Sequence, residues 1–286
     1  MPQFIDEYGV AVTYYEWLVP SPKAIVQVAH GLGEYASRYE AFAKDLNAAG
    51  YSVIANDHRG HGETGMNQHA GDSTRLGRLG PGGLRAATAD IHDLSELIRL
   101  EHPNAPLVLL GHSWGSLMAQ KILNSHPGDY DGIVLTGTAY RTFTSMESGN
   151  LNKRHKTLGT TGYEWLSRDT GVSDAFLADP LTFYANVPKL FGIVDGLRLL
   201  GRPTKDLPPN LPVLIQIGSE DSLGGPKSIE KLAKSYRERS GLKDVQTKIY
   251  EGARHEIFNE TNRDEVIGDL VAWLDAHLRT DRKKGA

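Results

Sequence analysis

Three residues of this sequence, Ser113, Asp221 and His255, could together break an ester or amide bond. A serine hydroxyl attacks a carbonyl only when a base, usually histidine, takes its proton, and an acidic group orients that base. Gly111 and Gly115 frame the serine in a Gly-x-Ser-x-Gly pattern. This spacing is typical of a nucleophile elbow, a strained turn in which small residues two positions away avoid backbone collisions. The pattern predicts that Ser113 is a nucleophile.

The candidate acid and base follow the serine in the chain order of a Ser-acid-His hydrolase. Each of the three residues comes shortly after an apolar stretch, at 107–110, 211–217 and 245–250. If these stretches are parallel strands, their carboxyl ends share one edge of a sheet, and the three side chains gather there. Glu220 is as anionic as its neighbour Asp221, so both remain candidates for the acid.

Two backbone N–H groups are candidates for an oxyanion hole, the pair of donors that stabilises the charged intermediate. One belongs to Trp114, directly after the serine. The other belongs to Leu32, in the glycine-containing loop that follows a strand predicted at 24–29. Only the main chain of these residues is expected to act.

Strand and helix patterns alternate from residue 24 to 138 and resume at 211. This alternation predicts an α/β fold, with a mostly parallel sheet covered by helices on both faces. Residues 140–209 interrupt it with many aromatic residues and no convincing strand. We therefore expect a core formed by 1–139 and 210–286, with 140–209 as a mostly helical insertion that caps it.

Two glycine-rich stretches are predicted to be turns or loops. Residues 57–62 hold two histidines, but no standard metal-ligand spacing is completed, so a structural turn is the better interpretation. Residues 65–83 contain six glycines and show no core-forming periodicity, which favours a loop. At His255 the second histidine of a zinc-protease helix is missing. Neither a metal nor a cofactor is expected.

Composition narrows the function further. The formal charge of −4 argues against a general nucleic-acid binder. The absence of cysteine excludes disulfides and thiolate chemistry. The N-terminus lacks the pattern of a signal peptide, and no stretch approaches the ~18 apolar residues of a membrane span. We expect a cytoplasmic protein.

Several motifs resemble those of one family, the monoglyceride lipase and lysophospholipase group of serine α/β-hydrolases. The similar blocks, which occur in that family's order, lie at 30–34 with Arg38 and Tyr39, and at 57–62, 111–115, 218–221 and 255–260. The insertion matches more loosely, at 165–169 and 178–181.

The resemblance implies the α/β-hydrolase fold with a helical cap. It also implies that Ser113 is the nucleophile, Asp221 rather than Glu220 the acid, and His255 the base, with Leu32 and Trp114 forming the oxyanion hole. Members of the group typically cleave carboxylic esters of monoacylglycerols or related lipids without a cofactor.

The sequence departs from the family pattern at a few positions. Trp114 and Ser116 stand where the family often has methionine and glycine, Tyr35 where histidine is common, and Thr64 where serine is usual. The indole of Trp114 beside the nucleophile is expected to narrow the acyl pocket. The expected partner is a small, apolar ester; transient membrane contact through the cap stays open, and no oligomeric state is predicted.

Two other functions remain open from the sequence. An aminopeptidase or amidase would use the same nucleophile and would need an acidic group in the insertion to hold the substrate amine. Six acidic residues are available there: Glu147, Glu164, Asp169, Asp174, Asp179 and Asp195. The second alternative is a non-catalytic binding protein with a hydrolase-like fold.

Overall fold

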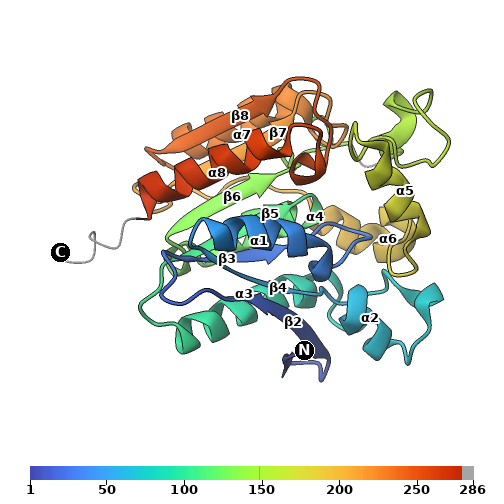
Figure 1. The fold of residues 1–286 in the computed structure, drawn as a ribbon, viewed down its shortest axis with the longest axis horizontal. Coiled ribbons are helices and arrows are strands. Elements are labelled where there is room, and N and C mark those ends of the chain that lie inside the picture. Colours follow the sequence, from blue (N-terminus) through green and yellow to red (C-terminus); the bar gives the residue numbers. More distant parts are fainter. Residues whose placement is uncertain (148, 279–286) are drawn as a thin grey trace.

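The core of the molecule is an eight-stranded sheet, seen in a computed structural model that describes residues 1–147 and 149–278 (Figure 1). Residues 148 and 279–286, which fall in the predicted insertion and in the second core segment, lie outside the described residues. The strands are β1 (Gln3–Ile5), β2 (Ala11–Trp17), β3 (Ile25–Ala29), β4 (Ser52–Asn56), β5 (Leu107–His112), β6 (Gly132–Thr136), β7 (Val213–Gly218) and β8 (Val245–Tyr250).

Their spatial order is β1-β2-β4-β3-β5-β6-β7-β8. Strands β1 and β2 run antiparallel to their neighbours, and every other pairing is parallel. The predicted fold class, a mostly parallel sheet between helices, is confirmed.

Helices cover both faces of this sheet. The helices of the described chain are α1 (Glu40–Ala48), α2 (Gly62–Gln68), α3 (Gly83–Glu101), α4 (Trp114–Ser125), α5 (Thr170–Ala178), α6 (Val187–Arg198), α7 (Gly225–Glu238) and α8 (Arg263–His277). Residues of α3, α4 and α7 share one apolar core with the sheet, and residues of α1 and α8 share a second core on the other face. Central strand β5 is buried on both faces, with Leu107 and Leu109 in the first core and Val108 and Leu110 in the second. This is why its sequence is a continuous apolar run rather than an alternating one.

Helix α2 shows that the prediction of a loop over residues 65–83 was wrong for 65–68, whereas 69–82 form turns and irregular backbone apart from a short 3-10 helix, Ser73–Arg75. The glycines of this region were interpreted as loop formers, but some of them allow close packing. A Cβ on Gly65 would come within 2.4 Å of the Gly60 carbonyl carbon. Thr64, in the same helix, accepts a hydrogen bond from the backbone N–H of Thr13 on β2. The helix therefore packs closely on the 57–62 turn through Gly65 and is joined to β2 through Thr64.

The segment 140–209 lies beyond the carboxyl ends of the parallel strands and contains α5 and α6 (Figure 1). A short 3-10 turn, Leu151–Arg154, adds to these helices, and no strand occurs among the segment's described residues. Helix α6 is bent at Gly192, whose φ of 69° interrupts the helical backbone. No helix of the described chain is long and apolar enough to cross a membrane.

Candidate active site

Ser113 lies on the sharp turn between β5 and α4. Its backbone has φ 52° and ψ −122°, in the region that residues other than glycine rarely adopt. The backbone N–H of Ser113 donates to the Thr136 carbonyl at the end of neighbouring β6, at 3.0 Å. Strand pairing therefore holds the strained turn in place. This is the geometry of the predicted nucleophile elbow.

The two glycines around the serine are needed because other backbone segments approach them closely. A Cβ on Gly115 would lie 2.1 Å from the Ala29 carbonyl oxygen of β3, and one on Gly111 would lie 2.6 Å from the Cα of Ser116. Contacts this short between a real Cβ and backbone do not occur. Any side chain at either position would push the elbow away from the sheet.

Asp221 and His255 follow β7 and β8 and meet directly. Nδ1 of His255 lies 2.9 Å from Oδ1 of Asp221, and both side chains are buried. Glu220 instead forms an ion pair with Arg154 at 2.5 Å, on a partly exposed surface. Of the two adjacent carboxylates considered as candidates, only that of Asp221 contacts the imidazole.

The environment of His255 leaves its second nitrogen available. Nε2 is buried and makes no hydrogen bond within the described part of the chain. Burial alone would lower the pKa of His255, but the Asp221 carboxylate, assisted by Glu256 and Glu34, raises it above its ordinary value. An imidazole held by a carboxylate on one side and unpartnered on the other is suited to accept a proton.

Trp165 of the insertion lies close to the histidine and shares a pocket with the serine. Its ring centroid lies 4.6 Å from that of His255, and the same side chain lines a pocket together with Ser113. The backbone N–H of His255 donates to the Trp165 carbonyl at 3.3 Å. No direct hydrogen bond joins Ser113 and His255 among the described contacts. Trp165 therefore connects the surroundings of His255 with the pocket of Ser113.

The predicted oxyanion donors lie beside this serine. Leu32 and Trp114 both line the pocket that contains Ser113. Within the described chain, the backbone N–H of neither residue donates a hydrogen bond, whereas that of Gly31 is bonded to Glu34 Oε1 at 2.5 Å. Both predicted donors thus remain free to bind a ligand oxygen.

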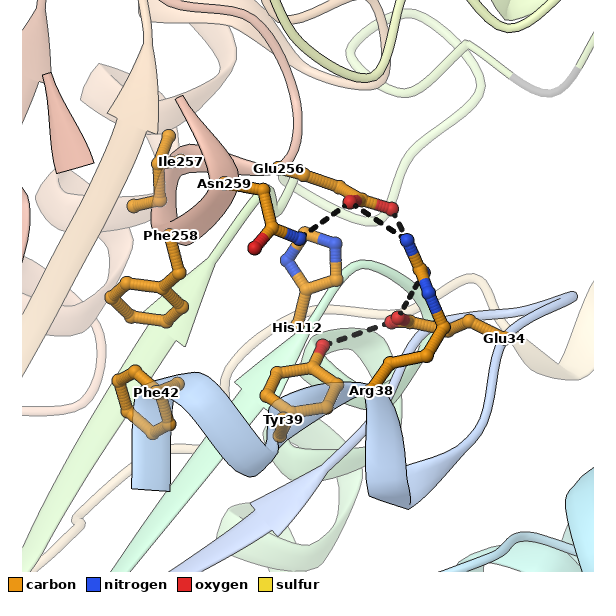
Figure 2. A pocket seen from close by; sticks show the side chains of 9 residues that line it. All are labelled: Glu34, Arg38, Tyr39, Phe42, His112, Glu256, Ile257, Phe258 and Asn259. Atoms are coloured by element: carbon orange, nitrogen blue, oxygen red, sulfur yellow. Dashed lines mark hydrogen bonds and ion pairs between the residues drawn. The ribbon is translucent and has the colours of Figure 1, made fainter. Parts of the chain in front are cut away.

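A buried ionic network, whose role was not predicted, lies next to the site (Figure 2). The guanidinium of Arg38 contacts Glu34 at 2.8 Å and Glu256 at 3.1 Å, and the hydroxyl of Tyr39 donates to Glu34 at 2.9 Å. Burial favours the neutral form of both carboxyls and raises the pKa of Glu34, whereas Arg38 keeps the pKa of Glu256 below its usual value. The network ties the loop of Leu32 to the loop of His255.

His112, the residue before Ser113, also faces this network (Figure 2). Its ring centroid lies 4.9 Å from that of His255. Burial, together with the nearby His255, lowers the pKa of His112 to about 3, so it stays neutral at physiological pH. A neutral ring here does not compete with His255 for a proton.

The histidine rings of the 57–62 turn form hydrogen bonds with backbone carbonyl groups. Nε2 of His58 lies 3.1 Å from the His30 carbonyl oxygen, and Nδ1 of His61 lies 2.8 Å from the Arg59 carbonyl oxygen. Burial lowers the pKa of His58 to about 3 and that of His61 to about 4. These contacts agree with the interpretation of a structural turn.

A pocket of about 100 Å³ opens beside Ser113, between the core and the insertion. Core residues Leu32, Trp114, Leu117 and Leu223 form one side of it. The insertion supplies Met146, Glu147, Gly149, Leu151, Trp165, Ala185, Val187, Gly196 and Leu199. The lining is mostly apolar, with the carboxyl group of Glu147 as an exception.

Comparison with known proteins places this geometry in a family. The sequence profile described as serine aminopeptidase, S33, matches residues 20–262. The chain belongs to this family.

Its relatives include ester-cleaving enzymes. A monoacylglycerol lipase of Mycolicibacterium smegmatis is 31% identical over 283 residues, covering 94% of this chain and 95% of its own. The human monoglyceride lipase is 29% identical over 276 residues, covering 91% and 85%. A carboxyl esterase from Bacillus coagulans, solved in complex with glycerol, superposes with a TM-score of 0.84 at 25% identity, covering 97% of this chain and 98% of its own.

These similarities confirm the resemblance noted in the sequence. The protein is a carboxylic ester hydrolase with the α/β-hydrolase fold, like the monoglyceride lipases.

Proposed function

We propose that the protein cleaves monoacylglycerols or closely related esters by two-step acyl transfer, with Ser113 as nucleophile, His255 as base and Asp221 as acid. The observation that carries this proposal is the buried imidazole of His255. One of its nitrogens is hydrogen-bonded to Asp221, and the other makes no hydrogen bond in the described structure. Its ring centroid lies 4.9 Å from that of His112, the residue before Ser113.

In the first step, Nε2 of His255 takes the proton of the Ser113 hydroxyl as the oxygen attacks the ester carbonyl. The backbone N–H groups of Leu32 and Trp114 bind the resulting oxyanion, and the alcohol leaves with the proton from His255. Water then attacks the acyl-enzyme in the same way and releases the acid. Loss of one oxyanion donor typically costs on the order of 10²-fold in rate, so the position of the Leu32 loop matters as much as that of the side chains.

The apolar pocket supports an acyl group as the bound part of the substrate. Trp114 and Leu117 from the core and Val187 and Leu199 from the insertion are among its lining residues. Burial of methylene groups against such surfaces contributes about 0.8 kcal/mol each. The relatives named as monoacylglycerol lipases support glycerol as the alcohol.

We also propose that the insertion touches lipid surfaces transiently when it collects an apolar substrate. Helix α6 exposes Ile193, Val194 and Leu197, of which Ile193 is 79% exposed. Co-sedimentation with phosphatidylcholine vesicles tests this contact, and an Ile193→Ser variant is expected to bind them less.

The decisive experiment is a panel of monoacylglycerols from 8 to 18 carbons, assayed by glycerol release with Ser113→Ala as the blank. Hydrolysis with a maximum at one chain length is expected. Activity on short synthetic esters alone, with none on any monoacylglycerol, would reject the lipid substrate while keeping the hydrolase.

Amide hydrolysis is the second candidate, favoured by one observation. Among the six acidic residues considered for holding a substrate amine, Glu147 lines the pocket of Ser113. Aminoacyl-naphthylamides should be assayed beside the esters. Cleavage of the amides that falls in Glu147→Gln, with ester cleavage unchanged, would favour an aminopeptidase.

A further inference from the structure

A second cavity, of about 440 Å³, lies between α3, α4 and the chain around residue 201. It shares no lining residue with the pocket of Ser113. Its size is within the range of small-molecule sites.

The charges around this cavity are one-sided. Four basic residues line it: Arg85 of α3, Lys121 of α4, Arg141 after β6, and Arg202 after α6. No aspartate or glutamate is among its described lining residues. The whole chain has a formal charge of −4, so a group of four basic residues with no acidic residue among them differs from the overall charge balance of the protein.

Arg141 is the most unusual of the four because it is buried, with 2% exposure. Its guanidinium donates to the Gln120 side-chain oxygen and to the Leu199 carbonyl, both at 3.1 Å. These acceptors are neutral, and no carboxylate forms an ion pair with Arg141 in the described structure. A buried charge without a counter-charge is costly, so an anion close to it would be stabilising.

Lys121 adds a second, half-buried cation. Its amino group donates to the Arg198 carbonyl at 3.2 Å. Burial, together with the charges of Arg141 and Arg198, lowers the pKa of Lys121. The lowered pKa agrees with a crowding of positive charge, of which only Arg198 has a carboxylate partner, Asp195, in the described structure.

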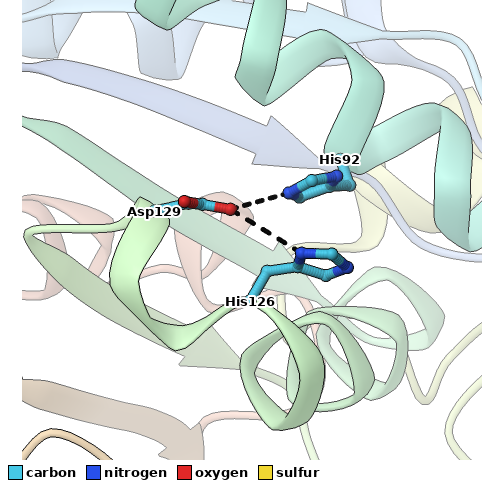
Figure 3. A group of neighbouring side chains, drawn as sticks. All are labelled: His92, His126 and Asp129. Carbon is cyan, nitrogen blue, oxygen red and sulfur yellow. Dashed lines mark hydrogen bonds and ion pairs between the residues drawn. The ribbon is translucent and has the colours of Figure 1, made fainter.

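Two histidines complete the wall of the cavity (Figure 3). The rings of His92 and His126 are stacked with centroids 3.8 Å apart. Asp129 faces both, 2.8 Å from Nε2 of His92 and 3.8 Å from Nδ1 of His126. The nearby carboxylate is therefore engaged with the histidines and does not line the cavity.

We infer that this cavity binds a small phosphate-bearing anion, with Lys121 and Arg141 supplying charge at its base and Arg85 and Arg202 closing on it from the exposed rim. Guanidinium groups suit this ligand class because their N–H groups match two phosphate oxygens at once. The cavity has room for a small group attached to the phosphate, as in a phosphomonoester.

Isothermal titration calorimetry at low ionic strength tests the inference, with pyrophosphate and glycerol 3-phosphate as probes. EDTA is included so that no metal held by the histidines can mediate binding. Saturable binding at one site is expected, with a Kd below about 1 mM. A lack of saturable binding by both probes and by the vesicles described below would overturn the inference.

Charge-matched variants locate the site. Lys121→Gln and Arg202→Gln are expected to weaken binding by about tenfold each. Lys234→Gln, which removes an exposed cation of α7 outside the cavity, is expected to bind like the wild type. Equal binding by all three variants would place the anion elsewhere and reject the inference.

Thermal unfolding provides an independent readout. A ligand that binds only the folded protein raises Tm, so pyrophosphate is expected to raise the Tm of the wild type and less that of Arg141→Met. If Arg141→Met does not fold, the Lys121 and Arg202 variants are compared in its place. An equal rise in Tm in the wild type and the variants would contradict the assignment.

One further arm identifies the source of the phosphate. Phosphatidylcholine vesicles with and without phosphatidic acid are compared with glycerol 3-phosphate in solution. Binding to either phosphate source that is lost in Lys121→Gln supports the site, and the source that binds more tightly distinguishes a lipid headgroup from a free metabolite.

Discussion

The carboxyl edge of the sheet and the insertion over it are built differently. At the sheet edge, Ser113 and Asp221 follow the buried strands β5 and β7, and His255 follows the edge strand β8; parallel pairing sets the register of these strands. The insertion consists of short helices and connecting loops, and α6 leaves apolar side chains exposed. Rigid strands suit groups that must be aligned for chemistry, whereas short helices and loops can adjust their positions to the shape of the substrate.

The two regions are nevertheless joined at the site. The carbonyls of Trp165 and Leu166 accept hydrogen bonds from the backbone of His255 and Glu256, and the N–H of Phe183 donates to Gly33 in the oxyanion loop. Substitutions in the two regions are therefore expected to differ in the size and kind of their effect on activity. Substitutions at the sheet edge should abolish turnover. Substitutions in the insertion should change the relative rates at which different substrates are cleaved.

The largest effect is expected from Ser113→Ala. Without the nucleophile, hydrolysis of a short p-nitrophenyl ester should fall by on the order of 10⁴-fold or more. Labelling by a fluorophosphonate probe should disappear, and Tm should stay close to that of the wild type. A wild-type protein that the probe fails to label would instead favour a binding protein, and retained turnover in the variant would remove Ser113 from the mechanism.

Asp221→Asn should come next, with a loss of about 10³- to 10⁴-fold in kcat, because the imidazole loses the partner that sets its tautomer and supports its charge. The matched control is Glu220→Gln, one residue away, whose ion pair with Arg154 is partly exposed. That variant should stay within a few-fold of the wild type. The opposite ranking would exchange the roles of the two carboxylates.

A smaller effect concerns pH. His255 must be neutral to accept a proton, and its pKa lies above the ordinary value of 6.5 because of the nearby carboxylates. The kcat/KM should therefore fall as pH decreases through a limb centred above pH 6.5. The residual activity of Asp221→Asn should show this limb at lower pH, since the main charge that raises the pKa is gone. If the limb of Asp221→Asn lies at the same pH as that of the wild type, the group that titrates is not His255.

The smallest effect on activity is expected from substitutions in the insertion. Val187→Ala removes pocket lining supplied by the insertion, so kcat/KM for longer acyl chains should change by roughly two- to tenfold, with p-nitrophenyl acetate nearly unaffected. Leu158→Ala, an exposed position of the same insertion, serves as the control. An equal change in kcat/KM at all chain lengths would show that the insertion affects the catalytic step and not the choice of acyl chain.

The sheet edge could be predicted from the sequence because its signals are local. Glycines that frame a serine after an apolar run have few uses, and Gly111 and Gly115 indeed meet backbone atoms closely. The choice between Glu220 and Asp221 was less accessible. It depends on a tight turn in which the N–H of Asp221 donates to the Gly218 carbonyl, and the preference came from the family resemblance.

Two other features could not be predicted, for different physical reasons. Helix α2 was missed because glycine is common both in loops and where backbones touch, as Gly65 and Gly60 do. The ion pair between Arg38 and Glu256 joins positions 218 residues apart, and no local pattern reveals such a contact. Their motifs were noticed, but the network they form required the structure.

The placement of Trp114 and Trp165 in the lining of the Ser113 pocket also has an optical consequence. They are two of only four tryptophans in the chain, and the other two, Trp17 and Trp273, lie outside that pocket. Two of the four indoles therefore line the pocket that an ester would enter. Unlabelled fluorescence titration can follow occupancy of the pocket directly, and single tryptophan-to-phenylalanine exchanges can assign the signal to the core or to the insertion.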